Sequence, residues 1–431
     1  MVASWGRLPI DGPGRTVEED WRFEELPVIA EDDTLLAYGS GRSYGDSCIN
    51  SQGSHISTRK LDRFISFDRE QGLLHCESGL TLDEILQIIV PAGWFLPVVP
   101  GTRFITLGGA IANDVHGKNH HRAGSFGCHV RSLQLLRSDR SRPVCTPSVN
   151  KELFGATIGG LGLTGLITRA EIRLIPISSC EMVTENLTFS SVSEFLDIST
   201  GSADWEYSVA WIDSFARNGQ VGRGIFSRAK HAEVPSGLQS KTRRLGVPFA
   251  PPFSLINKYT VDYFNRAYYA VNRSKKGQRY SHYQPFFFPL DGIANWNRIY
   301  GSSGFYQYQC VIPSESGQDA VQQLLNDVHH SGEGSFLAVL KAFGGIRSPG
   351  LLSFPRPGLT LALDFPNRGE KTRHLLDMLD KTVERAGGAL YSAKDARMSP
   401  ALFATGYPRV DEFMSQLDPA FSSAFWRRVR P

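Results

Sequence analysis

The alternation of hydrophobic and polar positions divides the chain into parts that are built in different ways. Up to about residue 178, short apolar runs are followed by glycine-rich stretches, as where residues 34–38 (TLLAY) lead into GSGRSYGD. This pattern predicts strands that end in loops. One helix is predicted over residues 82–89, where apolar residues recur at helical spacing behind the capping box Thr81-x-x-Glu84.

Between residues 181 and 380 the pattern changes to alternating runs separated by turn residues, which predicts an antiparallel sheet with long insertions. The clearest runs are VAWID, GFYQYQCVIP, SFLAVLKAFG and GLTLALDFP. The two-residue period of a strand places Gln307 and Gln309 on one face and aligns Lys341 with the apolar Val339. A polar side chain on a buried face needs a partner, so each row either faces a ligand cavity or lies on an exposed face.

Residues 227–283 are predicted to interrupt this sheet as a long mobile insertion. The stretch is rich in Lys, Arg, Tyr and Phe, and for most of its length its pattern is neither helical nor strand-like. Loops of this length are uncommon unless they are functional or disordered. Basic and aromatic residues together suit an anionic membrane surface or a phosphorylated substrate, and a solvated loop is the alternative.

Two elements are predicted near the C-terminus. Residues 387–395 (GGALYSAKD) are interpreted as a strand. Ser399 and Pro400 mark the start of a helix, because serine caps a helix and proline is favoured at the first helical position.

Composition indicates an ordinary soluble protein of about two domains. The 431 residues are 41% hydrophobic and 21% charged, and the net charge of +3 is too small to indicate a nucleic-acid partner. The six cysteines are scattered without a C-x-x-C pair, which favours free thiols in a reducing compartment. Neither a secretory signal nor an apolar run of about 18 residues is visible. We expect a cytoplasmic protein and leave peripheral contact with a membrane open.

Two glycine-rich stretches carry the candidate chemistry, residues 39–46 and residues 99–130 (VPGTRFITLGGAIANDVHGKNHHRAGSFGCHV). Glycine lets backbone amides approach a diphosphate closely, so both stretches indicate a cofactor site. A dinucleotide fingerprint of the Rossmann kind would place a helix after the first stretch. The polar SCINSQGSHIST follows instead, so that fold is rejected. A surface turn is the alternative interpretation of the first stretch.

Three interpretations compete for His116, His120 and His121. A metal site is disfavoured because no Glu or Asp completes a zinc pattern, and we predict no metal. The imidazoles either bond to the backbone as structural groups or form a polar wall beside a bound cofactor. The glycine-rich stretches that bracket them favour the polar wall.

The motifs GSGRSYGD, PGTRFITLGGAIANDVHGKNHHRAGSFG, GGLGLTG and LYSAKD, in this order, resemble the flavin-dependent decaprenylphosphoryl-ribose 2-oxidases. These enzymes belong to the vanillyl-alcohol-oxidase superfamily, which binds FAD. AWIDS, NWNRIYGSSGFYQYQ, FLAVLKAFG, LSFPRPG, LDFP and YPRVDE extend the resemblance over nearly the whole chain. HGKNHH together with GRSYGD is the specific part of the signal, since glycine loops alone are common.

The resemblance implies an α+β fold in which a two-lobed FAD-binding domain of the PCMH type accompanies an antiparallel-sheet substrate domain flanked by helices. The expected boundaries are residues 1–178 for the FAD-binding domain and 179–388 for the substrate domain. Residues 389–431 are expected to return to the FAD-binding domain as a C-terminal segment.

The resemblance also implies the cofactor and its contacts. By position, residues 37–47 correspond to the diphosphate loop. The residues expected to bind FAD are Gly39, Ser40, Gly41, Arg42, Ser43, Tyr44, Gly45, Gly101, Thr106, Leu107, Gly108, Gly109, Asn113, His116, Ile167 and Tyr391. In relatives with covalently attached flavin a histidine occupies the position of Arg42, so FAD is expected to be non-covalent here.

The implied activity is oxidation of a secondary alcohol, carbon 2 of a polyprenyl-phosphoryl pentose or a close analogue, by hydride transfer to the flavin. This is the first half of an epimerisation, and an NAD(P)H-dependent short-chain reductase is the implied partner. Lys394 matches the family's active-site lysine, and its pKa near a desolvated flavin could fall enough for it to act as a base. His116 and Lys118 are the further catalytic candidates. The residues expected to contact the substrate are Tyr44, Trp211, Phe287, Gln309, Lys341, Thr360, Ala362 and Lys394.

Three expected substrate contacts depart from the family. Thr360 and Ala362 replace an asparagine and a cysteine, and Phe287 replaces a tyrosine. The alternative substrate is therefore a soluble glycoside or nucleoside intermediate of specialised metabolism. Two further alternatives are a flavin-binding protein without turnover and, supported only by the basic insertion, a nucleic-acid-binding module.

Overall fold

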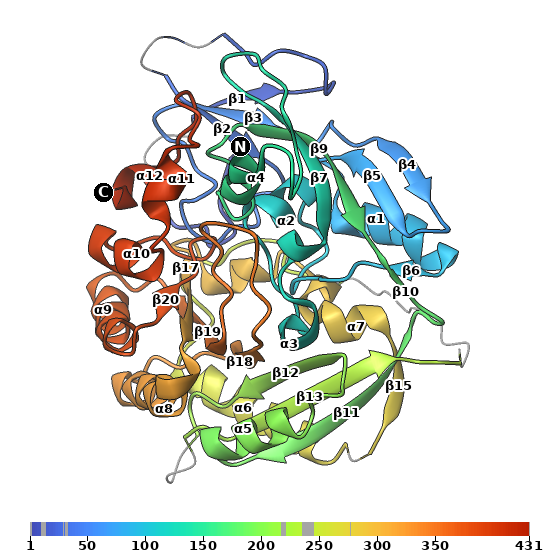
Figure 1. The fold of residues 1–431 in the computed structure, drawn as a ribbon. Helices are drawn as coiled ribbons and strands as arrows, with labels where there is room; N and C mark the ends of the chain where they lie inside the picture. The colour runs from blue at the N-terminus through green and yellow to red at the C-terminus, as the bar shows by residue number, and fades with distance from the viewer. Residues whose placement is uncertain are drawn as a thin grey trace.

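The chain folds into two lobes that are built around different sheets (Figure 1). The computed structural model describes residues 2–9, 14–28, 30, 33–216, 221–234, 245–275 and 277–430. Its mixture of helices and antiparallel sheets confirms the predicted α+β class and two-lobed fold. No helix in these ranges is long and apolar enough to cross a bilayer.

The first lobe contains short sheets and short helices from the N-terminal part of the chain. A parallel sheet consists of β1 (Arg15–Glu18), β3 (Ser54–Ser57) and β2 (Leu35–Tyr38). An antiparallel sheet consists of β4 (Phe64–Asp68), β5 (Leu73–Glu77), β9 (Leu166–Arg173), β7 (Val130–Leu136) and β8 (Val144–Cys145), and β6 (Trp94–Phe95) pairs with β10 (Ile175–Pro176). The helices are α1 (Leu82–Ile89), α2 (Leu107–Ala112), α3 (His120–Ala123) and α4 (Lys151–Thr157).

Helix α1 forms where the sequence predicts it. The Thr81 hydroxyl accepts a hydrogen bond from the Glu84 amide at 3.2 Å, and the Glu84 carboxylate accepts one from the Thr81 amide at 2.6 Å. This capping box satisfies amides that would otherwise lack partners at the start of the helix. The apolar stripe of α1 is buried in the core of the first lobe.

The second lobe is built on an eight-stranded antiparallel sheet. Its strands, in spatial order, are β15 (Arg279–His282), β11 (Glu181–Phe189), β13 (Gly224–His231), β12 (Tyr207–Ile212), β18 (Ala338–Phe343), β19 (Gly358–Pro366), β17 (Phe305–Ile312) and β20 (Ala389–Leu390). A separate parallel pair consists of β14 (Leu245–Gly246) and β16 (Ile293–Ala294). The helices that follow the first lobe are α5 (Val192–Thr200), α6 (Lys258–Arg273), α7 (Tyr283–Phe287), α8 (Ser314–Ser331), α9 (Glu370–Arg385), α10 (Pro400–Gly406), α11 (Val410–Met414) and α12 (Ala424–Val429).

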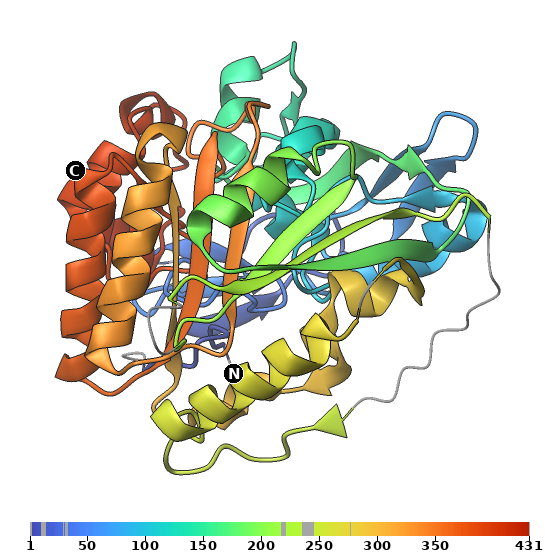
Figure 2. The same cartoon turned by 90° about the horizontal axis from the view of Figure 1, so that it is seen from below.

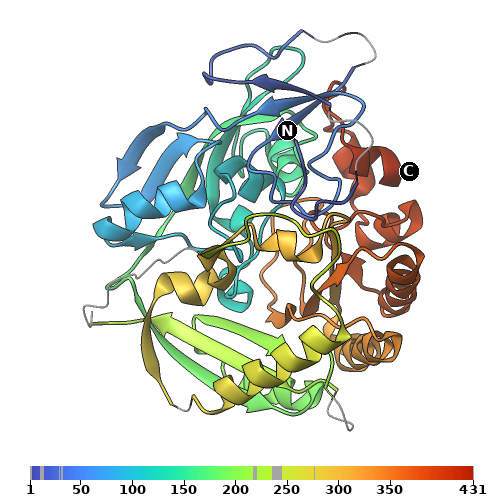
Figure 3. The ribbon, with the colours of Figure 1, turned by 180° about the vertical axis from the view of Figure 1, so that it is seen from behind.

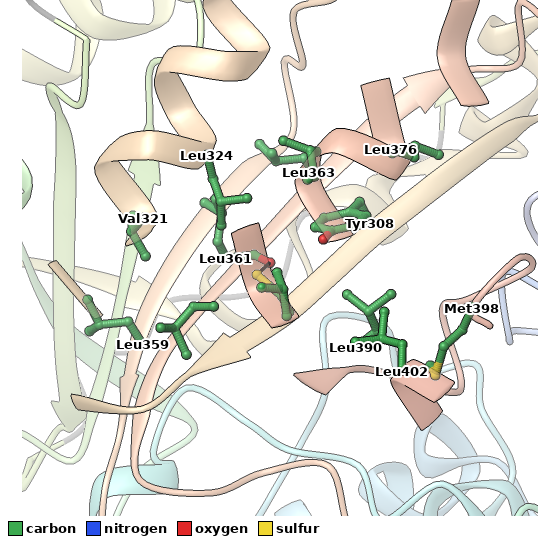
Figure 4. Close-up of a cluster of buried hydrophobic side chains, with 14 of the residues drawn as sticks. Tyr308, Val321, Leu324, Leu359, Leu361, Leu363, Leu376, Leu390, Met398 and Leu402 are labelled. Carbon is green, nitrogen blue, oxygen red and sulfur yellow. Dashed lines mark hydrogen bonds between the residues drawn. The ribbon is translucent and has the colours of Figure 1, made fainter. Parts of the chain in front are cut away.

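The two faces of this sheet have different surroundings. Helices α8 and α9 lie together against the strands β17 and β19, and α6 runs across β11 and β13 (Figures 2 and 3). On β19 the leucines at 359, 361 and 363 point into the core below α8, where Val321 and Leu324 also lie (Figure 4). The alternate residues of β19 therefore face the first lobe, because successive side chains of a strand point to opposite faces.

The C-terminal residues contact both lobes. Strand β20 extends the eight-stranded sheet by pairing with β17, while Phe421 forms a bridge with Leu35 of the parallel sheet. Helix α10 begins at the predicted position, with the Ser399 hydroxyl accepting from the amide of Leu402.

Two sequence predictions are wrong in this part of the chain. Residues 227–283 contain a 16-residue helix, α6, instead of an irregular loop for most of their length. The helix begins at the capping box of Asn257 and Thr260. Its buried residues are the apolar Val261 and the polar Asn265 and Asn272, so polar residues interrupt the apolar stripe that would mark a helix in the sequence. The part of the predicted mobile insertion at 235–244 and 276 lies outside the described residues.

The predicted strand over residues 387–395 is limited to β20. The Tyr391 amide still donates to the carbonyl of Gln309, but the amides of Lys394 and Asp395 donate back to the Tyr391 carbonyl. A turn therefore ends the strand just before Lys394. The sequence also missed helix α4, because its short apolar stripe merges into the glycine-rich passage that follows.

Candidate active site

A cavity of about 490 Å³ lies where the glycine-rich loops of the first lobe face the eight-stranded sheet. Most predicted cofactor contacts line it: Gly39, Ser40, Gly41, Arg42, Ser43, Tyr44, Gly101, Thr106, Gly108, Gly109, Asn113, His116, Ile167 and Tyr391. Six predicted substrate contacts line the same cavity: Tyr44, which is also a predicted cofactor contact, and Gln309, Lys341, Thr360, Ala362 and Lys394. Motifs from three distant parts of the chain therefore meet in one space.

The loop that follows β2 needs glycine for two different reasons. Gly41 has a φ of +60°, a conformation that residues with a Cβ rarely adopt. A Cβ at Gly45 would collide with the carbonyl oxygen of Asp395, so the loop packs directly on the segment that carries Lys394. Gly45 itself is absent from the cavity lining, and its role in the structure is this close packing.

Buried polar atoms without a protein partner indicate that the cavity suits a polar occupant. Within the described part of the chain, Arg42 Nε, Ser47 Oγ, Ser78 Oγ and His116 Nδ1 are buried and make no hydrogen bond, and all four residues line the cavity. An unpaired buried polar group costs about 1–3 kcal/mol, so a bound group that pairs with these atoms is favoured. Together with the glycine loop, these atoms fit a diphosphate-bearing cofactor such as FAD.

His116 is held as a neutral imidazole in the cavity wall. Gln309 Nε2 donates to His116 Nε2 at 3.0 Å, which leaves the ring proton on the unpartnered Nδ1. The ring packs among Phe343, Phe354 and Tyr391, with centroids 4.9 to 5.7 Å away. Burial, and then the nearby ammonium of Lys341, lowers the pKa of His116 well below its ordinary value. The residue therefore offers a hydrogen-bond donor without a charge.

Lys394 lies on the aromatic face of Tyr44, with Nζ 3.6 Å from the ring centroid. Burial lowers the pKa of Lys394, Asp364 opposes this change and Lys341 adds to it. A cation over an aromatic ring keeps its position without a hydrogen bond. The amine is therefore placed in the cavity, and its lowered pKa favours the neutral form that can accept a proton.

Lys341 is a second half-buried amine on the same wall. Its Nζ donates to the carbonyl of Gly117 at 3.3 Å, and burial lowers its pKa to about 7. Thr360 lies opposite Lys341 in the strand register, and its hydroxyl accepts from Gln309 at 3.1 Å. The predicted alternation is confirmed: Gln307 and Gln309 face the cavity together with Lys341.

Asp364 is a buried carboxyl that the sequence analysis did not single out. It follows Thr360 and Ala362 in the cavity-facing row of β19, and it pairs in register with Gln307. Gln307 Nε2 donates to its Oδ1 at 2.6 Å, and the Tyr300 hydroxyl donates to its Oδ2 at 3.4 Å. Burial raises the pKa of Asp364, and Lys394 opposes this change. The two-residue period of GLTLALDFP could have identified this position.

Three further predicted residues lie outside the cavity lining. The Lys118 amine donates to the carbonyl of Phe286 and lies over the Phe286 ring. Trp211 donates from Nε1 to the Phe336 carbonyl at 3.0 Å, and its ring contacts a tyrosine of α6. Phe287 is fully buried in the hydrophobic core that also contains the apolar stripe of α1. Of the predicted flavin contacts, Leu107 is likewise a core residue at the start of α2.

The favoured prediction of a polar wall beside the cofactor is wrong for His120 and His121, which lie outside the cavity lining and bond to the backbone instead. His120 Nδ1 accepts from the Gly344 amide at 3.2 Å, and His121 Nε2 lies 3.0 Å from the Trp205 carbonyl oxygen. Across the described ranges, no group of three or more His, Cys, Asp or Glu side chains is arranged to hold a metal ion.

Sequence reasoning also missed Trp5, which lines the cavity from the N-terminal arm. The Trp5 amide donates to the Ser43 carbonyl at 2.7 Å, and the Arg42 guanidinium lies 4.0 Å from the Trp5 ring centroid. Arg42, which the family resemblance is expected to place where covalent relatives have an attaching histidine, is thus held by an aromatic ring. No spacing in the sequence connects residue 5 with this loop.

Comparisons with known proteins identify the class of this site. Residues 29–140, which include the glycine-rich loop and helix α2, match the family described as an FAD binding domain. The chain is also similar to a D-arabinono-1,4-lactone oxidase of Yarrowia lipolytica, with 25% identity over 49% of this chain and 40% of that protein. The fold and the cavity therefore define an FAD-dependent oxidoreductase.

Two longer matches identify the family. The chain is 38% identical to the decaprenylphosphoryl-β-D-ribose oxidase of Mycolicibacterium smegmatis, over 92% of this chain and 89% of that enzyme. It is 32% identical to an uncharacterized protein of Streptomyces coelicolor, over 81% of this chain and all of that protein. The chain belongs to the decaprenylphosphoryl-β-D-ribose oxidase family, which confirms the resemblance seen in its motifs.

The side chains that line the cavity indicate what the chain itself contributes to an FAD-dependent oxidation. Bound FAD would supply the hydride acceptor. The loops at 39–43 and 106–113 would hold FAD, while Lys394, His116 and Gln309 present a base, a neutral donor and an amide toward the same space. The apolar surroundings of these groups keep water from competing for their hydrogen bonds.

Proposed function

We propose that this enzyme oxidises the carbon-2 hydroxyl of a polyprenyl-phosphoryl pentose, or of a close analogue, to a ketone with FAD as the hydride acceptor. The observation that carries the proposal is Lys394, a half-buried amine held on Tyr44 in a cavity that the predicted flavin loops also line. Oxidation of an alcohol requires a group that takes the hydroxyl proton as the hydride leaves. Lys394 is the group in the cavity that suits this role.

The other polar groups of the cavity have supporting roles in this proposal. His116 and Gln309, which hydrogen-bond each other, orient the hydroxyl groups of the sugar. Lys341 lines the cavity, and its only hydrogen-bond acceptor among the described residues is the carbonyl oxygen of Gly117, so its ammonium is able to attract the substrate phosphate. Lys118 contributes indirectly, since its amine fixes the HGKNHH segment to α7.

The proposal is tested by mixing the purified yellow enzyme with candidate substrates without oxygen. The panel contains polyprenylphosphoryl pentoses and hexoses, the same sugars without a lipid, and nucleosides. We expect the flavin absorbance to bleach with a polyprenylphosphoryl ribose and a 2-keto sugar to form. Bleaching by none of the lipid-linked sugars would contradict the proposal.

A soluble glycoside or nucleoside is the second candidate substrate. Thr360 and Ala362, where the family resemblance implies an asparagine and a cysteine, favour it, because both residues line the cavity. An amide and a thiol are absent from a wall that would contact the sugar or its carrier. For such a substrate, the rate of flavin bleaching would not increase when a lipid tail is added.

We further propose a reductase partner. Oxidation at carbon 2 becomes an epimerisation only when a second hydride reduces the ketone from the opposite face. An NAD(P)H-dependent short-chain reductase would supply that hydride. When such a reductase is added to the enzyme and its lipid-linked substrate, NAD(P)H should be consumed only after the flavin enzyme has turned over.

We also propose a peripheral contact with an anionic membrane through α6. Two of the three buried residues of this helix are polar (Val261, Asn265 and Asn272), whereas the aromatic Tyr259, Tyr263 and Phe264 are exposed. Asn265 is held in place by donating to Asp213 Oδ1 at 2.8 Å. An exposed apolar surface of this kind is typical of an interaction site.

Charge and position support the same membrane surface. Residues 245–282 contain six Lys and Arg residues and one acidic residue. Strand β14, at the start of this segment, pairs with Ile293 and Ala294, which line the cavity. Binding to anionic lipid would therefore place the entrance of the cavity near the lipid-linked substrate.

A further inference from the structure

We propose that Asp364 is a positioning residue for the oxidation: its carboxylate is the counter-charge for the ammonium that forms when Lys394 takes the substrate's hydroxyl proton. The inference rests on the proposed function, in which Lys394 is the base. In that step the O–H bond of the substrate's carbon-2 hydroxyl breaks and an N–H bond forms at Lys394 Nζ. The C–H bond of carbon 2 breaks at the same time, and its hydride is transferred to FAD.

The position of Asp364 follows from the alternation of β19. Thr360, Ala362 and Asp364 form one row on the cavity-facing side, and the leucines between them are buried in the core behind the sheet. Thr360 and Ala362 line the cavity, whereas Asp364 lies beyond the lining and is fully buried. Asp364 is therefore placed to act on a cavity residue and not to contact the substrate.

A continuous set of side chains connects Asp364 with Lys394. Gln307 donates to Asp364 at 2.6 Å and also hydrogen-bonds Tyr44. Tyr44 in turn supports the Lys394 amine on its ring at 3.6 Å. On the other side of the carboxyl, the Tyr300 ring stacks on Phe305, whose ring meets Tyr44 edge to face. These aromatic rings exclude water, so a charge on Asp364 acts strongly on its neighbours.

The balance of charge around Lys394 makes Asp364 the important anion. The titratable groups facing Lys394 are Asp364 from β19, Lys341 from β18, His116 from the first lobe and Tyr44 from the loop after β2. His116 is held neutral, and burial raises the pKa of Tyr44. Lys341 repels a proton on Lys394, and Asp364 attracts it. An unpaired buried ammonium would be costly, so the carboxylate makes Lys394 a stronger base.

The inference is tested by measuring the reactivity of Lys394 without any substrate. The holoenzyme is labelled with a trace of acetic anhydride at a series of pH values, and the extent of acetylation of the Lys394 peptide is determined by mass spectrometry. Only the neutral amine reacts, so the midpoint of the curve reports the proton affinity of Lys394. In Asp364→Asn we expect the midpoint to move to lower pH by about one unit, because a neighbouring opposite charge is lost. In Asp364→Glu, which keeps the charge, it should stay near the wild-type value.

A matched control and a second neutral variant keep the result interpretable. Asp213 is as deeply buried as Asp364 but accepts its hydrogen bonds from Arg223 and Asn265, so Asp213→Asn should leave the Lys394 midpoint unchanged. If Asp364→Asn does not fold, Asp364→Ser is measured in its place. Superimposable labelling curves for the wild type and the neutral variant would overturn the inference.

The labelling result is independent of the substrate. Should no sugar reduce the flavin, the proposed function fails while the effect of Asp364 on Lys394 is still measured. With an active polyprenylphosphoryl ribose, the same variant should also move the acid limb of the flavin-reduction profile to lower pH and lower its plateau, since a weaker base takes the proton more slowly.

Discussion

At the scale of single residues, the cavity contains two half-buried lysines in different surroundings, and we propose a different task for each. Lys394 is held on an aromatic ring with a carboxyl behind it, which suits a group that takes up a proton. Lys341 donates to a carbonyl oxygen and forms no ion pair with any residue that the structure describes, which suits a group that attracts an anion. His116 lies between these roles as a neutral donor.

The rate of flavin reduction by a lipid-linked ribose should depend on pH through Lys394. Burial lowers the pKa of Lys394 below the ordinary 10.5, and only the neutral amine accepts a proton. The rate should therefore rise as the pH increases through this lowered pKa and fall below it. Stopped-flow measurement of the flavin absorbance across pH checks the sign, and a rate that falls over this range as pH rises would contradict the role of Lys394.

Replacing the base should separate binding from chemistry. In Lys394→Ala we expect FAD to remain bound while flavin reduction slows by about 10²–10⁴-fold, the usual contribution of a positioned base. Lys60→Ala, which removes an exposed lysine paired with Glu18, is the control and should reduce its flavin at the wild-type rate.

The site residues show which contacts a sequence can reveal. Gln309 and Lys341 were found because a two-residue period places polar side chains in an otherwise apolar row. Trp211 obeys the same period, yet its ring is covered by α6, whose position no local pattern indicates. Trp5 reaches the cavity from the N-terminal arm, a contact between residues far apart in the chain. Local alternation thus predicts which face a residue occupies, but not what covers that face.

At the scale of elements, helix α6 is the feature that the sequence described least well. A helix normally buries a stripe of apolar residues at helical spacing, and this spacing is what predicts the helix from the sequence. Asparagines on the buried face of α6 interrupt that pattern. Helix α1, with its capping box and four buried apolar residues, was predicted because its local signals agree with its packing. The exposed aromatic residues of α6, which have no counterpart on α1, are the basis of the proposed membrane contact.

The exposed face of α6 should determine membrane binding. In the double variant Tyr263→Ser with Phe264→Ser we expect binding to phosphatidylglycerol vesicles to weaken by at least about tenfold, because two aromatic side chains that would enter the interface are lost. Vesicle sedimentation measures the bound fraction. Phe64→Ser is the matched control, since Phe64 is 39% exposed and Phe264 is 41% exposed. Equal binding of the double variant and the control would contradict the membrane surface.

At the scale of the whole molecule, the C-terminal helices hold the two motifs of the site together. Arg428 of α12 donates to Asp46 at 2.7 Å and to Asp395 at 3.0 Å. Asp46 ends the GRSYGD motif, and Asp395 follows Lys394 in LYSAKD. One side chain near the end of the chain thus connects the cofactor loop with the catalytic segment.

Removing this connection should weaken both folding and cofactor binding. Arg428→Ala leaves two carboxylates without their common partner, and we expect a loss of roughly 2–4 kcal/mol in the free energy of unfolding. FAD should also stabilise the variant less than it stabilises the wild type. Arg409→Ala breaks an exposed pair with Glu412 and should change stability by less than about 0.5 kcal/mol. Thermal unfolding with and without added FAD distinguishes the two variants.

The mode of FAD attachment is a further property of the whole protein. Arg42, held against Trp5, occupies the position of the attaching histidine in covalent relatives, so we expect FAD to be released when the protein is precipitated with acid. The colour should appear in the supernatant. A yellow pellet would contradict non-covalent binding.

Isotopic substitution of the substrate tests the central claim most directly. The enzyme is mixed without oxygen with a polyprenylphosphoryl ribose that carries either hydrogen or deuterium at carbon 2, and bleaching of the flavin is followed in a single turnover. If the enzyme takes a hydride from carbon 2, the flavin should bleach more slowly with the deuterated sugar and the product should be the 2-keto sugar. Equal bleaching rates with both sugars, or a product oxidised at another carbon, would contradict the account.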